Sequence, residues 1–358
     1  MSNFFKNIFE SIFPSDWPVF DPNEPSPYNL STYKGRIAHF YTILDPRTLL
    51  IDTKQLNQAL DRLDKYKQNP SILYSNNTIN EKLNKQLWES KLTKQSIIHP
   101  DTDKPIFWAF RFSAFPVLNI PITTLLLFPG STTVTVVSQF INQTYNVAVN
   151  YSNRNASNPM TNSKLFVSYV AAVSMSCGIG FGLRQITKNY NLATNVFLRG
   201  FIPYTAITLA SCLNLYFIRW NEVTEGITLR IKCDKTEKET KENRIQTMEW
   251  KEVGKSRVAG NVALIKCCIA RMVWSVPPLF FPPMIMKGLF LNKQWFLRLK
   301  PWHKMCIESS VIGCVLFTFI PPSLATFPQR DSITNKWLEP QFKEQFSDDT
   351  LFYFNKGL

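Results

Sequence analysis

A run of amides in the middle of the chain has the clearest chemical meaning. The segment NQTYNVAVNYSNRNAS, residues 142–157, contains five asparagines. Four of them recur at spacings of four, four and three, so a helix would place them along one face. These are Asn142, Asn146, Asn150 and Asn153. An amide both donates and accepts hydrogen bonds, which suits a zwitterion such as an amino acid. The alternative is that the amides only join helices, at about 1 kcal/mol per hydrogen bond.

Two arginines could supply positive charge to the same region. Arg111 and Arg271 lie in apolar segments that contain no acidic residue to pair with them. An arginine in such a place can bind a substrate carboxylate through two hydrogen bonds. It can also extend toward the membrane surface, which applies most directly to Arg111 near the start of its segment. Glu308 is the single candidate for an intramembrane carboxylate, which favours facilitated movement or exchange over a proton pump.

A short motif, His99-Pro100-Asp101-Thr102, precedes the first apolar segment. The proline and the oxygens of Asp101 and Thr102 predict a turn before a helix. No nucleophile accompanies His99, and no phosphate-binding glycine loop is present. The 7 cysteines and 3 histidines do not cluster as ligands of zinc, haem or an iron–sulfur centre. We therefore expect no enzyme activity, no metal and no cofactor.

The distribution of charge divides the chain into unlike parts. Lys and Arg number 40 and Asp and Glu 26, for a net charge of +14. No acidic residue occurs between Lys104 and Trp220, and Glu308 stands alone between Ala259 and Arg330. The excess positive charge therefore belongs to apolar runs with basic flanks, which are typical of membrane spans. A soluble nucleic-acid-binding protein would gather its bases on a polar surface, so we expect no nucleic-acid partner.

Apolar segments must carry these residues through the bilayer. They cover 106–128, 132–152, 165–183, 195–218, 260–290 and 306–327. Five spans is the best count, with four to six compatible, because 132–152 is less apolar and 260–290 contains two proline pairs. Internal prolines predict kinked or broken helices. Broken helices can surround a transport site, whereas prolines can also simply bend packed helices.

The predicted fold is all-α. We expect a polytopic membrane helix bundle with about five transmembrane helices, some broken by Pro, and a polar, mostly helical N-terminal region over residues 1–105. Amphipathic helices at 52–67 and 80–92 should pack on each other or lie on the membrane surface. The transmembrane domain covers 106–330, with a charged loop at 220–258, and 331–358 is a C-terminal tail.

Several stretches together resemble one family, the sideroflexins. They are HPDT at 99–102, RFSAF at 111–115, the asparagine-rich run at 142–157, IRWNEVTEGI at 218–227, GKSRVAG at 254–260, Arg271 with the prolines that follow it, and ATFPQR at 325–330. They occur in the family's order over roughly residues 20 to 335. The resemblance implies a multi-pass carrier of the mitochondrial inner membrane. It implies serine, or another small neutral amino acid, as the substrate, and HPDT as a family motif at the membrane boundary.

Two other functions remain open from the sequence. A non-transporting scaffold of the inner membrane would use the asparagines as helix contacts alone. A carrier of citrate-like anions agrees with the absence of carboxylates over 104–220. Iron as the transported cargo is disfavoured, because the chain has no cluster of soft ligands for a dedicated iron site. The expected partners are the lipid bilayer and a small amino acid, and the sequence identifies no protein partner.

Overall fold

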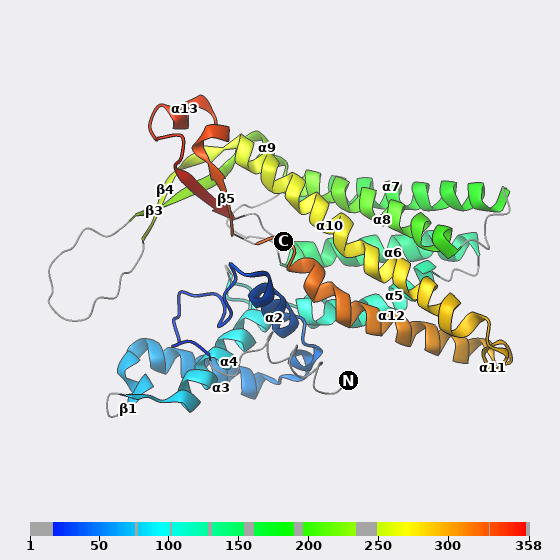
Figure 1. Ribbon diagram of the computed structural model, residues 1–358, viewed down its shortest axis with the longest axis horizontal. Coiled ribbons are helices and arrows are strands. Elements are labelled where there is room, and N and C mark those ends of the chain that lie inside the picture. The colour runs from blue at the N-terminus through cyan, green and yellow to red at the C-terminus, as the bar shows by residue number, and fades with distance from the viewer. Residues whose placement is uncertain are drawn as a thin grey trace.

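The computed structural model describes residues 17–75, 78–100, 102–127, 131–153, 161–189, 196–233, 249–328 and 330–355. A long helical bundle fills most of the molecule (Figure 1). A helical N-terminal region and a small sheet lie at one end of that bundle.

The N-terminal region is built from short helices around an aromatic core. Its elements are α2 (Tyr33–Ile43), η1 (Pro46–Leu50), α3 (Thr53–Gln68), η2 (Pro70–Leu73), the paired strands β1 (Tyr74–Ser75) and β2 (Thr78–Ile79), and α4 (Glu81–Ile97). Helices α3 and α4 confirm the two predicted amphipathic helices, and they pack on each other. Their starts follow from capping, because Asp52 accepts from the backbone N–H of Gln55 and Asn80 from that of Leu83. Phe20 and Trp88 pack edge to face in the core beneath them.

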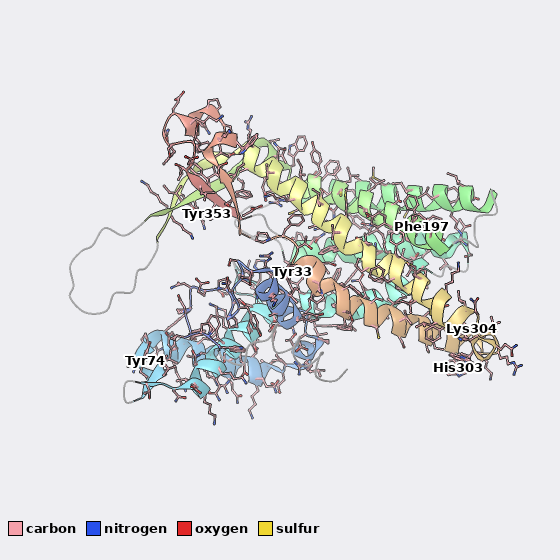
Figure 2. The ribbon with its side chains drawn as sticks, in the orientation of Figure 1. Tyr33, Tyr74, Phe197, His303, Lys304 and Tyr353 are labelled. Atoms are coloured by element: carbon pink, nitrogen blue, oxygen red, sulfur yellow. The ribbon has the colours of Figure 1, made fainter. Side chains whose placement is uncertain are left out.

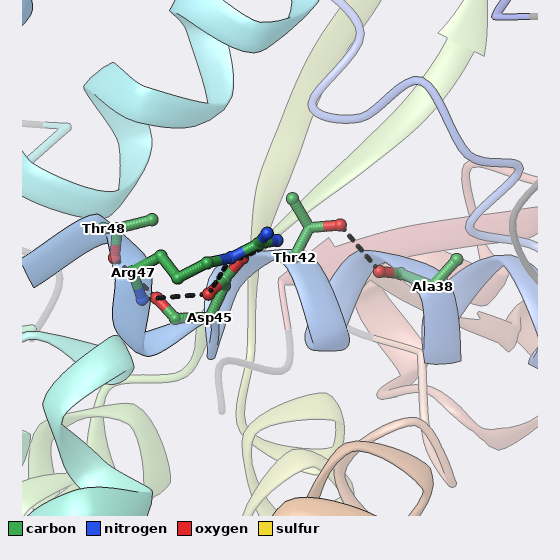
Figure 3. Close-up of polar contacts among 5 residues, drawn as sticks. All are labelled: Ala38, Thr42, Asp45, Arg47 and Thr48. Atoms are coloured by element: carbon green, nitrogen blue, oxygen red, sulfur yellow. Dashed lines mark hydrogen bonds and ion pairs between the residues drawn. The ribbon is translucent and has the colours of Figure 1, made fainter.

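A tight turn leads from α2 into η1 (Figure 3). Thr42 ends α2 with its hydroxyl donating to the carbonyl of Ala38 at 2.9 Å. Asp45 accepts from the backbone N–H of Arg47 at 2.9 Å and pairs with the guanidinium of the same residue. The hydroxyl of Thr48 donates to the carbonyl of Asp45 at 2.8 Å. These bonds satisfy backbone groups that a helix end leaves open, so the chain turns sharply toward α3.

Helices packed side by side form the bundle. They are α5 (Phe115–Leu127), α6 (Thr132–Ser152), α7 (Asn162–Asn189), α8 (Val196–Ile218), α10 (Arg257–Ile285) and α12 (Pro301–Leu324). Each packs against the next, and α12 packs against α5, so the bundle closes into a ring. In the described chain, α7, α8, α10 and α12 are long and apolar enough to cross a membrane, and Phe112–Leu127 is a shorter apolar helix. The predicted all-α membrane bundle is confirmed.

The first apolar segment, residues 106–128, is interrupted near Pro116, as its internal prolines predict. It begins with short turns at Trp108–Phe110 and Phe112–Ala114, whereas Pro121 lies inside α5 without breaking it. Helix α5 then has 13 residues, or about 20 Å, which is less than a bilayer core. Pro116 explains this start, because proline fits the first turn of a helix and cannot continue a preceding one.

The expected breaks at the proline pairs are absent. Helix α10 runs continuously through four prolines, and α12 contains Pro321 and Pro322 inside it. A proline removes one N–H from the ladder and leaves the carbonyl four residues earlier free. For Pro322 of α12 that carbonyl belongs to Thr318, and the hydroxyl of Tyr41 donates to it at 3.0 Å. This bond from α2 replaces the one that Pro322 removes.

A basic and aromatic turn connects α10 to α12. It contains the π-helix η6 (Met286–Leu291) and α11 (Gln294–Leu297). His303 and Lys304 follow this connection in the first turn of α12, at the end of the bundle away from the sheet (Figure 2). Trp295 and Trp302 expose more than half of their surface. Aromatic and basic side chains together are typical of the membrane–water interface.

The predicted charged loop at 220–258 is in part a sheet. Helix α9 (Trp220–Thr224) leads into β3 (Ile227–Cys233), which pairs with β4 (Glu249–Ser256). The C-terminal tail adds β5 (Arg330–Thr334) and β6 (Leu351–Asn355), with η7 (Asn335–Trp337) and α13 (Pro340–Lys343) between them. The antiparallel order is β4-β3-β6-β5. Charged residues on the strands resembled a solvated loop, but Leu229 and Phe352 form a core against the start of α10.

Candidate functional site

Helix α6 has its polar face inside the bundle and its apolar face outside. Its buried polar residues are Thr135, Ser138, Gln139, Asn142 and Gln143. Its exposed residues include Val137, Phe140 and Ile141. A soluble helix would show the reverse pattern, because burial of polar groups costs free energy unless they are hydrogen-bonded. The asparagine-rich run therefore directs amides into the bundle, as expected if a polar path runs through it.

The first asparagines of the stripe are incompletely paired. Asn142 is 3% exposed, and its Oδ1 accepts a hydrogen bond from Nδ2 of Asn146 at 3.2 Å. Among the described residues Nδ2 of Asn142 has no hydrogen-bond partner. A buried donor without a partner costs about 1–3 kcal/mol, so this amide is available to a polar ligand or water.

A neighbouring amide network was missed in the sequence analysis. Ser176 of α7 donates to Oε1 of Gln139 at 2.7 Å, and Nε2 of Gln143 donates to Ser176 at 3.3 Å. Gly180 makes room for this contact, because a Cβ there would lie 3.3 Å from Gln139. The two glutamines are four residues apart, so their spacing could have revealed them.

Helix α8 adds further polar groups to the interior. Asn214 is 1% exposed, and its Oδ1 is unpartnered within the described chain. The buried hydroxyl of Thr208 also has no hydrogen-bond partner within the described chain. Neither residue is predictable as a site residue from the sequence, because an isolated Asn or Thr in an apolar run has no periodic pattern.

Arg271 is the central charged group of the site. It lies midway along α10, is 7% exposed, and donates from Nη2 to Oδ1 of Asn150 at 3.3 Å. Its guanidinium carbon lies 5.6 Å from the ring centroid of Trp274. No carboxylate in the described ranges forms an ion pair with Arg271, and its Nε is buried without a partner there. The structure thus brings one stripe asparagine and one predicted arginine together.

Asn153 and Arg111 have different surroundings. Asn153 ends α6, and its Nδ2 donates to the carbonyls of Val149 and Phe110, both at 2.8 Å. The hydroxyl of Tyr145 donates to the carbonyl of Ala109 at 3.1 Å. Arg111 is partly exposed, and its Nε donates to the carbonyl of Ile106 at 3.0 Å. These contacts secure the turns before α5, and no bond joins Arg111 to the stripe among the described residues.

The HPDT motif lies at a pocket beside the end of α6. The backbone of His99 is bonded to Lys104 and Asp103 across a tight loop, which confirms the predicted turn. A cavity of about 260 Å³ is lined by His99, Thr102, Lys104, Pro105, Ile106, Phe107, Tyr151 and Ser152. Pro100 belongs to the same turn, and Asp101 lies outside the described residues. The pocket therefore joins the HPDT loop to the last turn of the asparagine-bearing helix.

The arrangement has the properties of a polar binding site. No group of His, Cys, Asp and Glu suited to a metal ion occurs in the residues that the structure covers. Amides, hydroxyls and one guanidinium can bind a small polar molecule with a carboxylate. Comparison with known proteins extends this description: residues 22–358 match the family described as Sideroflexins.

The chain belongs to the sideroflexin family. This sideroflexin is 35% identical to the Dictyostelium discoideum Sideroflexin over 354 residues, which is 96% of this chain and 99% of that protein. It is 32% identical to human Sideroflexin-5 over 351 residues, 96% and 94% of the two chains. It is 31% identical to Sideroflexin FSF1 of Saccharomyces cerevisiae over 349 residues, 93% and 96% of the two chains. No solved structure matches it.

The family match confirms the resemblance seen in the motifs. It also includes the tail after residue 335, which carries β6 of the sheet. Together with the apolar helices, it identifies the chain as a membrane protein of the sideroflexin family.

Proposed function

We propose that this sideroflexin is a multi-pass transporter of the mitochondrial inner membrane that moves serine or a similar small neutral amino acid. The observation that carries the proposal is Arg271, a buried cation midway along α10 that contacts Asn150 and has no ion pair among the described residues. A charge inside a membrane bundle is costly and is usually retained for function.

The chemistry of the site fits a zwitterion. The guanidinium of Arg271 can bind the substrate carboxylate, and amide oxygens can accept hydrogen bonds from its ammonium group. Amides also bond a serine hydroxyl without adding charge. The pocket at His99 and Tyr151 lies at the end of α6, which supports an opening of the proposed path there. The proposal includes no enzyme activity, no cofactor and no nucleic-acid partner, and assigns the lipid bilayer as the protein's surroundings.

Uptake of labelled L-serine into liposomes containing the purified protein tests the proposal. Saturable uptake that unlabelled alanine reduces and citrate does not would support an amino-acid carrier. Inhibition by citrate with no effect of alanine would favour an anion carrier. Absence of uptake, from protein shown to be folded and inserted, would overturn transport and favour the scaffold function.

The asparagine stripe has its own test. Asn146→Leu and Asn150→Leu remove amides from the interior, whereas Thr144→Val changes the exposed face of α6. We expect the two asparagine variants to lose serine uptake and the Thr144 variant to keep it. Normal uptake by folded asparagine variants would show that these amides serve only as helix contacts.

A further inference from the structure

The contact between α8 and α10 has a defined antiparallel register. Near the start of α8, a Cβ on Gly200 would lie 2.6 Å from the carbonyl oxygen of Leu279, so the two backbones approach closely there. The ring of Tyr204 lies 5.4 Å from that of Phe280. Toward the other end, Leu215 of α8 and Leu264 of α10 belong to one buried cluster. Each step forward along α8 therefore corresponds to an equal step backward along α10.

This register places two cysteines opposite each other. Cys212 lies three residues before Leu215, and Cys268 lies four residues after Leu264. The two thiols are near enough to each other to interact. Both are free thiols, and both are half-buried between the helices. Proximity of the two residues is the first requirement for a disulfide, and the shared level of the helix pair brings these two cysteines together.

Two arginines lie close to the cysteine pair. Arg271 follows Cys268 by one helical turn and interacts electrostatically with both thiols. Arg219 donates from Nη1 to the sulfur of the adjacent Cys267 at 3.1 Å. Nearby cations stabilise a thiolate, which is the reactive form of cysteine.

We propose that Cys212 and Cys268 are a redox modification site that closes into a reversible disulfide when a hydroperoxide reaches the bundle. One thiolate attacks the peroxide oxygen, breaks the O–O bond and becomes a sulfenic acid, and the departing oxygen leaves as water or an alcohol. The second sulfur then attacks the sulfenic sulfur and forms the S–S bond, and the hydroxyl leaves as water with the remaining thiol proton. The two cysteines are oxidised and the peroxide is reduced.

The consequence for transport rests on the proposed function. A disulfide would fix α10 to α8 one turn from Arg271. A transporter moves helices past one another to expose its site alternately on two sides, so the bond should restrict that movement. We expect oxidation to lower serine uptake about tenfold, within the usual range of coupling between two sites.

Peptide mapping tests the site without any reference to transport. The full chain in liposomes is treated with hydrogen peroxide, alkylated, digested and analysed by mass spectrometry. A Cys267→Ser background is included because Cys267 and Cys268 are adjacent. We expect a Cys212–Cys268 cross-linked peptide that dithiothreitol removes, that Cys212→Ser abolishes and that Cys314→Ser leaves unchanged. Alkylation of both thiols at the level of untreated protein, or cross-linking of Cys212 to Cys267 in the wild type, would overturn the proposal.

Serine uptake by the same liposomes tests the consequence. The wild type should lose uptake on oxidation and regain it with dithiothreitol, whereas Cys212→Ser should be insensitive. Full disulfide formation with unchanged uptake would overturn the link to transport. If the reduced protein takes up no serine while the cross-link forms, the proposed function fails and the redox site stands.

Discussion

At the residue scale, the two candidate arginines have different environments. Arg271 is buried midway along a span and contacts Asn150, whereas Arg111 lies at the start of the bundle and donates to the carbonyl of Ile106. Their sequence contexts are alike, since both lie in apolar runs without acids. Burial therefore separates the arginine that we propose as a binding group from the one that secures a turn.

Neutralising the two arginines should separate their roles. Arg271→Gln should reduce the rate of serine uptake about a hundredfold, because loss of a buried charged hydrogen bond costs about 2–5 kcal/mol. Arg111→Gln keeps a side chain that can donate to the same carbonyl, so it should reduce uptake only slightly. Uptake kinetics in liposomes would measure both. Equal losses in the two folded variants would contradict the assignment of Arg271.

His39 should make the stability of the protein depend on pH. It is buried in α2 beside the hydroxyl of Ser26 at 3.0 Å, and burial lowers its pKa from 6.5 to about 4. Between these values the unfolded chain binds a proton that the folded protein does not. Stability is therefore complete above about pH 6.5 and falls as the pH approaches 4, by up to about 3 kcal/mol. The melting temperature in detergent should fall more steeply with decreasing pH for the wild type than for His39→Gln. Parallel plots of melting temperature against pH for the two proteins would refute this.

At the element scale, close approach of helices depends on particular glycines. A Cβ at Gly200 of α8 would meet the carbonyl oxygen of Leu279 at 2.6 Å, whereas one at Gly182 of α7 meets nothing within 4 Å. Leu279 precedes Pro283 by four residues, so its carbonyl has lost its partner in the helix. The proline pair and the glycine thus belong to one helix contact.

Alanine substitution at these glycines should give opposite results. Gly200→Ala should lower the free energy of unfolding by about 1–3 kcal/mol, because backbone atoms must move apart. Gly182→Ala should leave it unchanged or raise it slightly, since alanine is the better helix former. Melting temperatures of the two purified proteins in one detergent would compare them. A Gly200 variant as stable as the Gly182 variant would show that α8 and α10 do not pack this closely.

At the scale of the whole molecule, the C-terminal tail holds the start of α10. Glu339 accepts from the hydroxyl of Ser256 at 2.7 Å and from the backbone N–H groups of Arg257 and Val258 at 2.7 and 3.0 Å. Partial burial raises the pKa of Glu339, but these hydrogen bonds outweigh it and leave the pKa lowered. Lys266 and Asp331 add an ion pair at 2.5 Å between α10 and β5. The helix that carries Arg271 is thus anchored by residues from the far end of the chain.

Removal of this anchor should weaken the whole sheet. Glu339→Ala should destabilise the protein by about 1–2 kcal/mol, because N–H groups at the helix start lose their acceptor and the helix dipole loses a compensating anion. Glu344→Ala, an exposed acid of the same tail, is the matched control and should have little effect. Chemical unfolding monitored by tryptophan fluorescence would compare the variants. Similar stability in both would indicate that the anchor contributes nothing.

The sequence by itself determined the membrane bundle, the two N-terminal helices and the family. Each depends on local pattern: apolar length, helical periodicity, capping residues and ordered motifs. The placement of the four asparagines on one side of a helix also followed from their spacing, because periodicity assigns residues to one face.

Only the tertiary structure decided which groups meet. The contact of Asn150 with Arg271, the facing cysteines on α8 and α10, and the bonds from Glu339 to α10 each join residues more than 50 positions apart. The sequence pattern at 227–233 and 249–256 predicts a charged loop, because β3 pairs on one side with β6 of the tail and that pairing is non-local. Tyr41 supplies the hydrogen bond that replaces the one lost at Pro322 of α12, and no pattern within α12 contains that information. Local sequence sets which face of a helix is polar, whereas packing of distant elements decides what that face contacts.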